Sequence, residues 1–248
     1  MNAMDTTLIG RVALITGASG GIGRAIARLL ASEGAAVALG YSSHPQEAAE
    51  LEAEIVAGGG RAVAIGADLR SSTGPSELVD ASEAALGPVD VLIANAGLGR
   101  TQQLEDISSD DFDETIAVNL RAPFLLAQRT LRSMRERGFG RVLFMSSVAA
   151  FTGGIVGPHY AASKAGLHGL THFLAGHVAA DGVTVNALAP ALIVETGLLP
   201  GDPEQLRQLV PVGRLGRPEE VAELAIALIR NAYLTNQVIS LDGGIHPR

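Results

Sequence analysis

Seven short runs of this chain consist almost entirely of apolar residues, and longer segments of mixed character separate them. A run in which apolar and polar residues do not alternate is typical of a parallel strand that helices cover on both faces. The runs therefore predict buried strands. They lie at 11–17, 35–41, 61–68, 89–97, 140–147, 182–190 and 237–244.

The segments between these runs carry apolar residues at spacings of three and four, which predicts amphipathic helices. The clearest examples are 21–34, 110–137 and 218–230. Strand and helix alternate along the chain, and right-handed crossovers between parallel strands then produce a doubly wound sheet. We predict a Rossmann-type α/β fold of about seven strands with helices on both faces and ligands at the carboxyl edge of the sheet.

Length and composition indicate one folded domain. The chain has 248 residues, 47% of them hydrophobic and 18% charged, and no segment resembles a linker between two domains. We therefore assign residues 1–248 to a single nucleotide-binding domain. Met1–Gly10 lacks the basic start and apolar centre of a signal peptide, so 1–8 is expected to form a loose leader.

Charge and residue usage exclude several classes of function. The formal net charge is −8 and no block of basic residues occurs, which argues against nucleic acid or an anionic membrane as the main partner. The absence of cysteine excludes disulfides and thiol chemistry, and no histidine spacing indicates a metal site. No apolar run approaches the ~20 residues that span a bilayer. A small-molecule substrate and a cytoplasmic location are expected.

The first predicted strand leads through a glycine-rich turn directly into a helix. In this turn Gly17 allows a tight bend, Gly21 allows close approach of a pyrophosphate, and Gly23 allows close packing of the helix. The helix N-terminus offers free N–H groups to an anion. The spacing Gly-x-x-x-Gly-x-Gly meets the common dinucleotide fingerprint only in part, so a simple glycine-rich turn is the alternative.

Tyr160 and Lys164 are four residues apart, and Ser147 lies thirteen residues before Tyr160. Side chains at i and i+4 share one face of a helix, so the ammonium of Lys164 can approach the phenol of Tyr160. A nearby cation lowers the tyrosine pKa from its free value of ~10, which would suit Tyr160 to acid–base chemistry on a carbonyl. Such pairs also occur on solvated helices, and the motif alone leaves both readings open.

Taken together and in this order, the motifs resemble those of the short-chain dehydrogenase/reductase family over about residues 8 to 246. The resemblance implies a nicotinamide cofactor. It rests on Thr16–Gly23, Ala67-Asp68-Leu69, Asn95-Ala96-Gly97, Asn119, Ser147, Tyr160, Lys164 and 186–190.

The resemblance also implies a catalytic tetrad. In that family the residue matching Tyr160 gives a proton to the carbonyl oxygen, and the one matching Ser147 hydrogen-bonds the same oxygen. Lys164 would hold the nicotinamide ribose and lower the pKa of Tyr160, and Asn119 would anchor a water that relays protons. The cofactor supplies the hydride.

Cofactor contacts are implied at the ends of several strands. Asp68 would meet the adenine side, and Asn95 with its neighbours would steady the sheet and line the cleft. The full set is Gly17, Ser19, Gly20, Gly21, Ile22, Gly23, Tyr41, Ser42, Ser43, Asp68, Leu69, Asn95, Ala96, Gly97, Tyr160, Lys164, Pro190, Ala191, Ile193 and Thr196.

Several of these residues have a structural alternative. Ser147 could cap the strand end, since Ser146 offers the same group, and Asn119 could be a structural amide. Asp68 could instead cap the next turn. His159 could face the substrate or the solvent, and the five other histidines are expected at helix surfaces or at the terminus.

The chain departs from the family pattern at three places. Ala94 replaces the first asparagine of the family's Asn-Asn-Ala-Gly. Thr196 follows Pro190 by six residues where the family has five, which leaves its contact with the nicotinamide amide open. Asn236 replaces a frequent glycine, a change that we do not interpret.

Cofactor choice should depend on the residues after the second strand, where an acid would bind the ribose 2′-hydroxyl and repel a 2′-phosphate. Here the chain reads Gly40-Tyr41-Ser42-Ser43-His44, which contains no acid. The arginines that many NADP-dependent relatives carry here are also absent. We favour NADP(H) over NAD(H), because hydroxyls and His44 can donate to a phosphate.

The overall likeness is greatest to β-ketoacyl-acyl-carrier-protein reductases, which predicts reduction of a 3-oxoacyl thioester. Gly138 and Asp181 stand where carrier-dependent relatives place arginines, although Arg135, Arg137 and Arg141 are nearby. A reductase or dehydrogenase of a free ketone or secondary alcohol is the alternative, and a nucleotide sensor without catalysis is the third.

Two further expectations concern loops and assembly. The substrate site should be shaped by Phe151–His159 and by a lid over residues 191–216. The helices predicted at Asp110–Arg137 and Pro158–Asp181 have more apolar residues than one sheet face can cover. In similar proteins these helices pair between subunits, so a homotetramer is expected.

Overall fold

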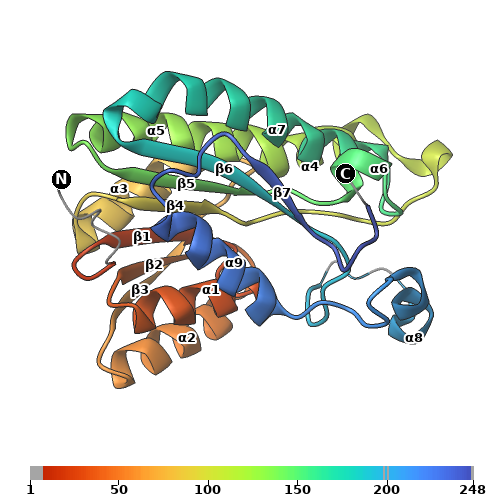
Figure 1. Cartoon of the computed structure of the whole chain (residues 1–248), viewed down its shortest axis with the longest axis horizontal. Coiled ribbons are helices and arrows are strands. Elements are labelled where there is room, and N and C mark those ends of the chain that lie inside the picture. Colours follow the sequence, from red (N-terminus) through yellow and green to blue (C-terminus); the bar gives the residue numbers. More distant parts are fainter. Residues whose placement is uncertain (1–7, 198, 200, 247–248) are drawn as a thin grey trace.

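The computed structural model describes residues 8–246 of the chain, except 198 and 200. Its strands form one seven-stranded sheet in the order β3-β2-β1-β4-β5-β6-β7, and every neighbouring pair is parallel (Figure 1). The predicted doubly wound α/β fold is therefore confirmed. The strands are β1 Val12–Thr16, β2 Ala36–Tyr41, β3 Arg61–Gly66, β4 Val91–Ala94, β5 Gly140–Met145, β6 Val183–Pro190 and β7 Val238–Leu241.

Helices cover both faces of this sheet. Helices α1, α2 and α9 pack below it in the view of Figure 1, and α3, α5 and α7 pack on the opposite face. The helices are α1 Gly21–Ser32, α2 Pro45–Ala57, α3 Gly74–Leu86, α4 Ser109–Ile116, α5 Ala122–Glu136, α6 Ala149–Thr152, α7 Pro158–Val178, α8 Pro203–Leu206 and α9 Pro218–Arg230. Short 3-10 turns lie at Leu104–Asp106, Ala179–Asp181 and Arg207–Leu209.

The two outermost strands differ from the prediction that all seven are buried. All residues of β1 and β5 are buried, whereas β3 and β7 are partly exposed. Each of these outer strands has a neighbour on one side only, so water reaches their backbone and side chains from the other side.

The helix predicted at 110–137 is interrupted near its middle. Helices α4 and α5 are joined by a π-helical turn at Ala117–Arg121. Pro123 follows this turn and has no N–H group for the carbonyl of Asn119, so the regular α-helical ladder cannot continue across it. Turns of this kind occur often at functional sites. Here it carries Asn119.

The start of the chain is more ordered than expected. Leu8 is only 2% exposed and belongs to the core beneath the sheet, so the predicted leader does not extend through this residue. The remainder of the leader, 1–7, lies outside the described residues. Among the described helices, none is both long and apolar enough to cross a lipid bilayer.

Candidate active site

A cleft of about 780 Å³ lies along the carboxyl edge of the sheet. Its walls come from the turn after β1, the ends of β4, β5 and β6, the start of α7 and the lid segment that follows β6. Every site residue predicted from the sequence lines it except Tyr41 and Asn119. One cleft therefore contains both the glycine turn and the tyrosine–lysine pair.

The glycine turn after β1 is packed too closely for side chains. Gly17 has a φ of +65°, in the left-handed region that favours glycine. A Cβ atom at Gly23 would lie 2.2 Å from the carbonyl oxygen of Gly17. A Cβ atom at Gly21 would lie 2.3 Å from the carbonyl oxygen of Glu195, so the lid backbone also packs on this turn.

Hydrogen bonds from β4 hold the glycine turn in place. The Thr16 hydroxyl accepts from the backbone N–H groups of Asn95 at 3.1 Å and Ala96 at 3.0 Å. The Asn95 amide nitrogen donates in return to the carbonyls of Thr16 at 3.0 Å and Gly17 at 3.2 Å. A single asparagine thus steadies the turn, although Ala94 replaces the amide before it.

Two backbone hydrogen bonds connect the beginning and the end of the lid predicted at 191–216. Val194 N–H donates to the carbonyl of Gly216 at 2.9 Å, and Gly216 N–H donates to that of Leu192 at 2.9 Å. Glu195 has a φ of +57°, which is unusual for a residue with a side chain. Glu195 lies between Pro190 and Thr196, where this chain has one residue more than the family pattern. The next residue, Thr196, lines the cleft, and its hydroxyl donates to the carbonyl of Ile193 at 2.9 Å.

Two predicted cofactor residues have other contacts. Tyr41 does not line the cleft, because its ring lies against Gly66, where a Cβ atom would be 3.2 Å from the phenol oxygen. Asp68 lines the cleft, but Arg70 binds both of its carboxylate oxygens, at 2.9 and 3.0 Å, which lowers the pKa of Asp68. Asp68 also accepts from the backbone N–H of Arg70 at 3.0 Å, so the structural alternative describes part of its role.

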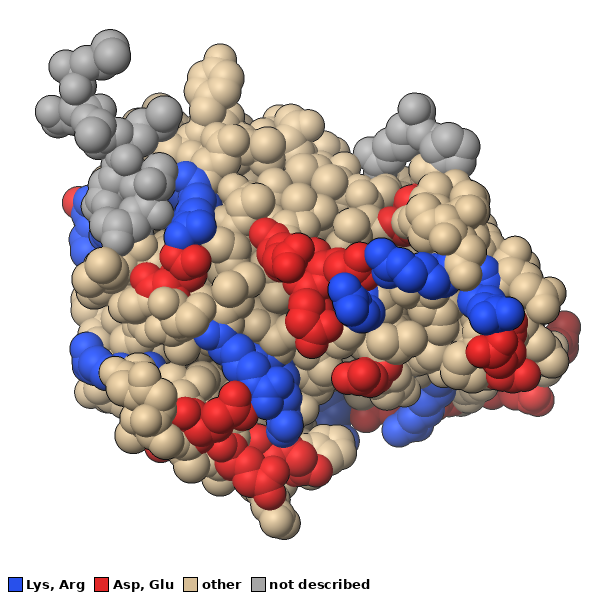
Figure 2. All heavy atoms as spheres, turned by 60° about the horizontal axis from the view of Figure 1, so that its bottom comes forward, with Lys and Arg blue, Asp and Glu red and all other residues tan. Residues whose placement is uncertain are grey.

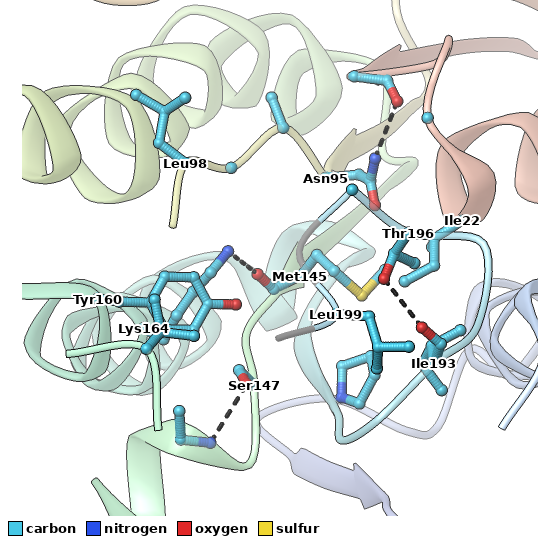
Figure 3. A pocket seen from close by; sticks show the side chains of 18 of the residues that line it. Ile22, Asn95, Leu98, Met145, Ser147, Tyr160, Lys164, Ile193, Thr196 and Leu199 are labelled. Atoms are coloured by element: carbon cyan, nitrogen blue, oxygen red, sulfur yellow. Dashed lines mark hydrogen bonds between the residues drawn. The ribbon is translucent and has the colours of Figure 1, made fainter. Parts of the chain in front are cut away.

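The Tyr160 phenol points into the cleft beside Ser147 (Figure 3). Tyr160 is 8% exposed, and Ser147 lies near enough to its phenol to lower the Tyr160 pKa. Ser147 Oγ also accepts from the backbone N–H of Ala149 at 3.2 Å, so it caps the strand end as well. Lys164 is 3% exposed, and its amine donates to the carbonyl of Met145 at 2.8 Å. Tyr160 and Lys164 thus both project from α7 toward the cleft, as the i and i+4 spacing predicts.

The electrostatics of this pair differ from the expectation. Burial raises the pKa of Tyr160, and the nearby Ser147 hydroxyl opposes that effect only in part. Burial also lowers the pKa of Lys164 to about 8, since a desolvated ammonium is disfavoured. The Lys164 nitrogen lies 5.7 Å from the centre of the Tyr160 ring. In this structure Tyr160 thus has a raised pKa, the opposite of the lowering that the family resemblance implies.

Asn119 lies behind the cleft and is completely buried. Its amide nitrogen donates to the carbonyl of Leu98 at 2.8 Å and to Ser163 Oγ at 3.0 Å, while its amide oxygen accepts from Leu98 N–H at 2.7 Å. Ser163 Oγ donates to the carbonyl of Tyr160 at 2.7 Å. Asn119 therefore connects the loop after β4 to the helix turn that carries Tyr160.

The sequence analysis missed two residues beside the catalytic group. Ser146 is 3% exposed, and its Oγ lies 2.8 Å from His168 Nε2, so His168 is no ordinary surface histidine. Its position four residues after Lys164, on the same helix face, was the available signal. His159 is 1% exposed and does not line the cleft, which decides against both alternatives left open for it.

The glycine turn fits a dinucleotide. Gly20 at the N-cap of α1 provides no side-chain cap, and the first turn of α1 contains no acidic residue. The N–H groups at this helix end can therefore bind an anion, because no carboxylate of the first turn competes for them. Ser42, Ser43 and His44 line the same part of the cleft.

Comparison with known proteins agrees with this geometry. A family model described as short chain dehydrogenase matches residues 11–206. The 3-oxoacyl-[acyl-carrier-protein] reductase of a Synechocystis species is 36% identical over 97% of this chain and 98% of that protein. The L-rhamnose 1-dehydrogenase (NAD(P)(+)) of Azotobacter vinelandii is 35% identical over 96% of this chain and 97% of that protein.

A solved structure is similar over nearly the whole chain. A blue fluorescent protein from a metagenomic library, in complex with NADPH, superposes with a TM-score of 0.91 and is 36% identical. The similarity covers 97% of this chain and 100% of that one. Sheet order, glycine turn, tyrosine–lysine pair and these full-length matches lead to one conclusion: the chain belongs to the short-chain dehydrogenase/reductase family of nicotinamide-dependent oxidoreductases.

Proposed function

We propose that this enzyme is an NADP(H)-dependent reductase that converts a ketone to a secondary alcohol, with Tyr160 as the general acid. The observation that carries the proposal is that Ser147, Tyr160 and Lys164 line the same cleft as the glycine turn. Gly17–Gly23, Asn95 and the lid around Thr196 would hold the cofactor. When bound, its nicotinamide supplies the hydride for the carbonyl carbon.

The protein residues would supply and guide the proton. A raised pKa keeps the Tyr160 phenol protonated at neutral pH, so it can donate to the carbonyl oxygen as charge develops there. Ser147 would donate a hydrogen bond to the same oxygen. Lys164, with a pKa of about 8, can both lose and regain a proton near neutral pH, which suits it to restore the proton that Tyr160 gives away.

The cofactor preference is supported by the residues after β2. Ser43 Oγ and His44 Nδ1 lie 2.9 Å apart, and both residues line the cleft with Ser42. These groups can donate to a 2′-phosphate, and no carboxylate follows β2 before Glu47. The solved relative described above holds NADPH, which favours the same choice.

A 3-oxoacyl thioester is the substrate that we favour, because one flank of the cleft is apolar and a curated relative is named for that activity. This flank is formed by Leu98, Val118, Val148, Ile155, Val156 and Leu209.

A free ketone is the second candidate, because the arginines near the expected carrier-docking region are paired with carboxylates. Arg135 contacts Asp181 at 2.6 Å, and Arg137 contacts Asp90 at 3.2 Å. Away from this region, acidic and basic side chains also lie next to each other on the face of α1, α2 and α9 that Figure 2 draws. Paired arginines attract an acidic carrier protein less strongly than free ones.

The homotetramer stays a proposal. Phe124 of α5 and Phe173 of α7 are 37% and 62% exposed, and contact between subunits would cover them. The other exposed side chains of α5 are polar, so α7 is the better candidate for the contact.

The first prediction concerns Tyr160. Tyr160→Phe removes the acidic proton while keeping the ring, so kcat for ketone reduction should fall about 10²- to 10⁴-fold. NADPH binding, measured by nicotinamide fluorescence, should change less than about threefold, and Tyr233→Phe at an exposed position is the matched control. Unchanged turnover would contradict Tyr160 as the general acid, whereas a wild type that binds NADPH without turnover would support a nucleotide-sensing protein.

The second prediction concerns cofactor choice. The wild type should have a higher kcat/KM for NADPH than for NADH. Ser42→Asp places a carboxylate where the 2′-phosphate should bind, and kcat/KM for NADPH should fall at least about tenfold while that for NADH changes little. Ser42→Asn is the uncharged control. A wild-type preference for NADH of about tenfold or more would contradict the proposal.

The third prediction concerns the effect of the buried Lys164 amine on the stability of the fold. The folded chain prefers neutral Lys164, so its stability rises with pH between about 8 and the ordinary lysine value of 10.5. Below about pH 8 the full cost of burying the charge, about 3 kcal/mol, is present. Lys164→Met should therefore stabilise the cofactor-free protein by about 2 kcal/mol at pH 7, after the lost hydrogen bond to Met145 is subtracted.

This advantage of Lys164→Met should disappear as the pH approaches 10.5, and urea unfolding at several pH values measures it. A stability difference that is independent of pH would contradict the shifted pKa. Lys164 is the only lysine of the sequence, so its signal in protein labelled with ¹³C-lysine can be assigned directly. Its midpoint should lie at about 8.

The fourth prediction separates the substrate candidates. If a thioester is the substrate, kcat/KM for acetoacetyl-CoA should exceed that for ethyl acetoacetate at least about tenfold. Because Arg135 is paired, acetoacetyl carrier protein should not be preferred over acetoacetyl-CoA, and its kcat/KM should depend weakly on salt. Faster turnover of the free ketone would favour the second candidate.

A further inference from the structure

Three consecutive residues at the end of β5 contact helix α7. The carbonyl of Met145 accepts from the amine of Lys164, and the Ser147 hydroxyl lies near the phenol of Tyr160 (Figure 3). Between them, Ser146 Oγ donates to the backbone carbonyl of Lys164 at 3.0 Å. The side chain of Ser146, next to Ser147, thus links the end of β5 to the backbone of α7.

The direction of the second hydrogen bond at Ser146 follows from its single proton. A carbonyl oxygen can only accept, so the Ser146 hydroxyl gives its proton to the Lys164 carbonyl. The contact of 2.8 Å with His168 Nε2 therefore requires that the imidazole donates from Nε2 to Ser146 Oγ. Only a side chain with an N–H or O–H group at this place can replace His168.

Aromatic packing fixes the orientation of His168. Its ring centre lies 4.7 Å from that of Phe151, in the helix that follows Ser147. Phe151 in turn stacks on His246, with ring centres 5.4 Å apart and planes 9° apart. This ring contact restricts the imidazole while its Nε2 contacts Ser146.

The backbone around Ser147 is already fixed toward the neighbouring strand. Ser146 N–H donates to the carbonyl of Leu188 at 2.7 Å, and Val148 N–H donates to that of Pro190 at 3.0 Å. These bonds hold the segment to β6 but do not set its separation from α7. That separation decides the distance between Ser147 and Tyr160, and the side chain of Ser146 spans it.

We propose that His168 is a positioning residue for the reaction: by donating to Ser146 it keeps the Ser147 hydroxyl beside the Tyr160 phenol. The proposal rests on the catalytic role of Tyr160 proposed above. His168 touches neither substrate nor cofactor and acts through Ser146. Since the Ser147 hydroxyl lowers the pKa of Tyr160, moving it away should raise that pKa further and weaken the general acid.

The test compares two substitutions of His168. His168→Leu removes the donor, and kcat should fall about tenfold, the rate effect of one neutral hydrogen bond. The KM for NADPH should stay within about twofold, because the glycine turn is not involved. His168→Gln offers an amide N–H in place of the imidazole and should recover most of the lost kcat. His172→Leu, at an exposed position of the same helix, is the matched control and should resemble the wild type.

A titration that does not depend on turnover separates this proposal from the proposed function. The chain has three tyrosines, so ¹³C-tyrosine labelling with Tyr160→Phe for assignment yields the pKa of Tyr160 directly. His168→Leu should raise it, and His168→Gln and His172→Leu should not. If Tyr160→Phe keeps full activity, the proposed function fails, but this titration still decides whether His168 acts on Tyr160.

Ser146→Ala provides a second route, which is useful if His168→Leu does not fold. It should raise the Tyr160 pKa in the same direction, and adding His168→Leu or His168→Gln to Ser146→Ala should produce no further change. The proposal is overturned if the Tyr160 titration is the same in the wild type, His168→Leu and Ser146→Ala. It is also overturned if His168→Gln is as impaired as His168→Leu, because packing alone would then explain the loss.

Discussion

The buried amine of Lys164 is the group around which this active site is organised. An ammonium with 3% exposure loses nearly all its hydration, and its described partner is a neutral backbone carbonyl, that of Met145. Such a group is tolerated where the surrounding structure holds it firmly. Gly97 illustrates how closely the neighbours approach, because a Cβ atom there would lie 3.2 Å from the amine.

The same desolvation determines the acid–base character of the site. In apolar surroundings both phenolate and ammonium are disfavoured, so the Tyr160 pKa is raised and the Lys164 pKa falls to about 8. At neutral pH the tyrosine therefore stays protonated, which is the state that ketone reduction requires. In the proposed mechanism, Ser147 and, through Ser146, His168 influence how readily this proton leaves.

The structure combines a rigid catalytic layer with a less regular substrate side. The proposed tetrad is held by β5, α7 and the π-helical turn, and each of these packs in the core. The outer part of the cleft is formed by the loop before α7 and by the lid, where Ile155 and Leu209 are more than half exposed. Relatives of similar identity are named for an acyl-carrier substrate and for a sugar. This division is consistent with a fixed reaction and a variable substrate.

The sequence alone determined the sheet, its parallel strands, the glycine turn and the tyrosine–lysine pair. Periodicity and glycine placement are local properties, and strand ends of a parallel sheet meet at one edge without further information. The contacts of Tyr41 and Asp68 could not be predicted in this way. Tyr41 lies against Gly66, and Asp68 binds Arg70. Only the folded chain brings the first pair together and decides that Asp68 binds Arg70.

The tertiary structure also decided the roles of groups that look ordinary in the sequence. Ser146 and His168 are 22 residues apart and become partners because β5 ends beside α7. Likewise, the raised pKa of Tyr160 depends on burial, which a motif four residues long does not report. Local patterns thus identify which side chains are present at the sheet edge. Packing decides which of these side chains are desolvated and which form hydrogen bonds with each other, because both depend on residues distant in the sequence.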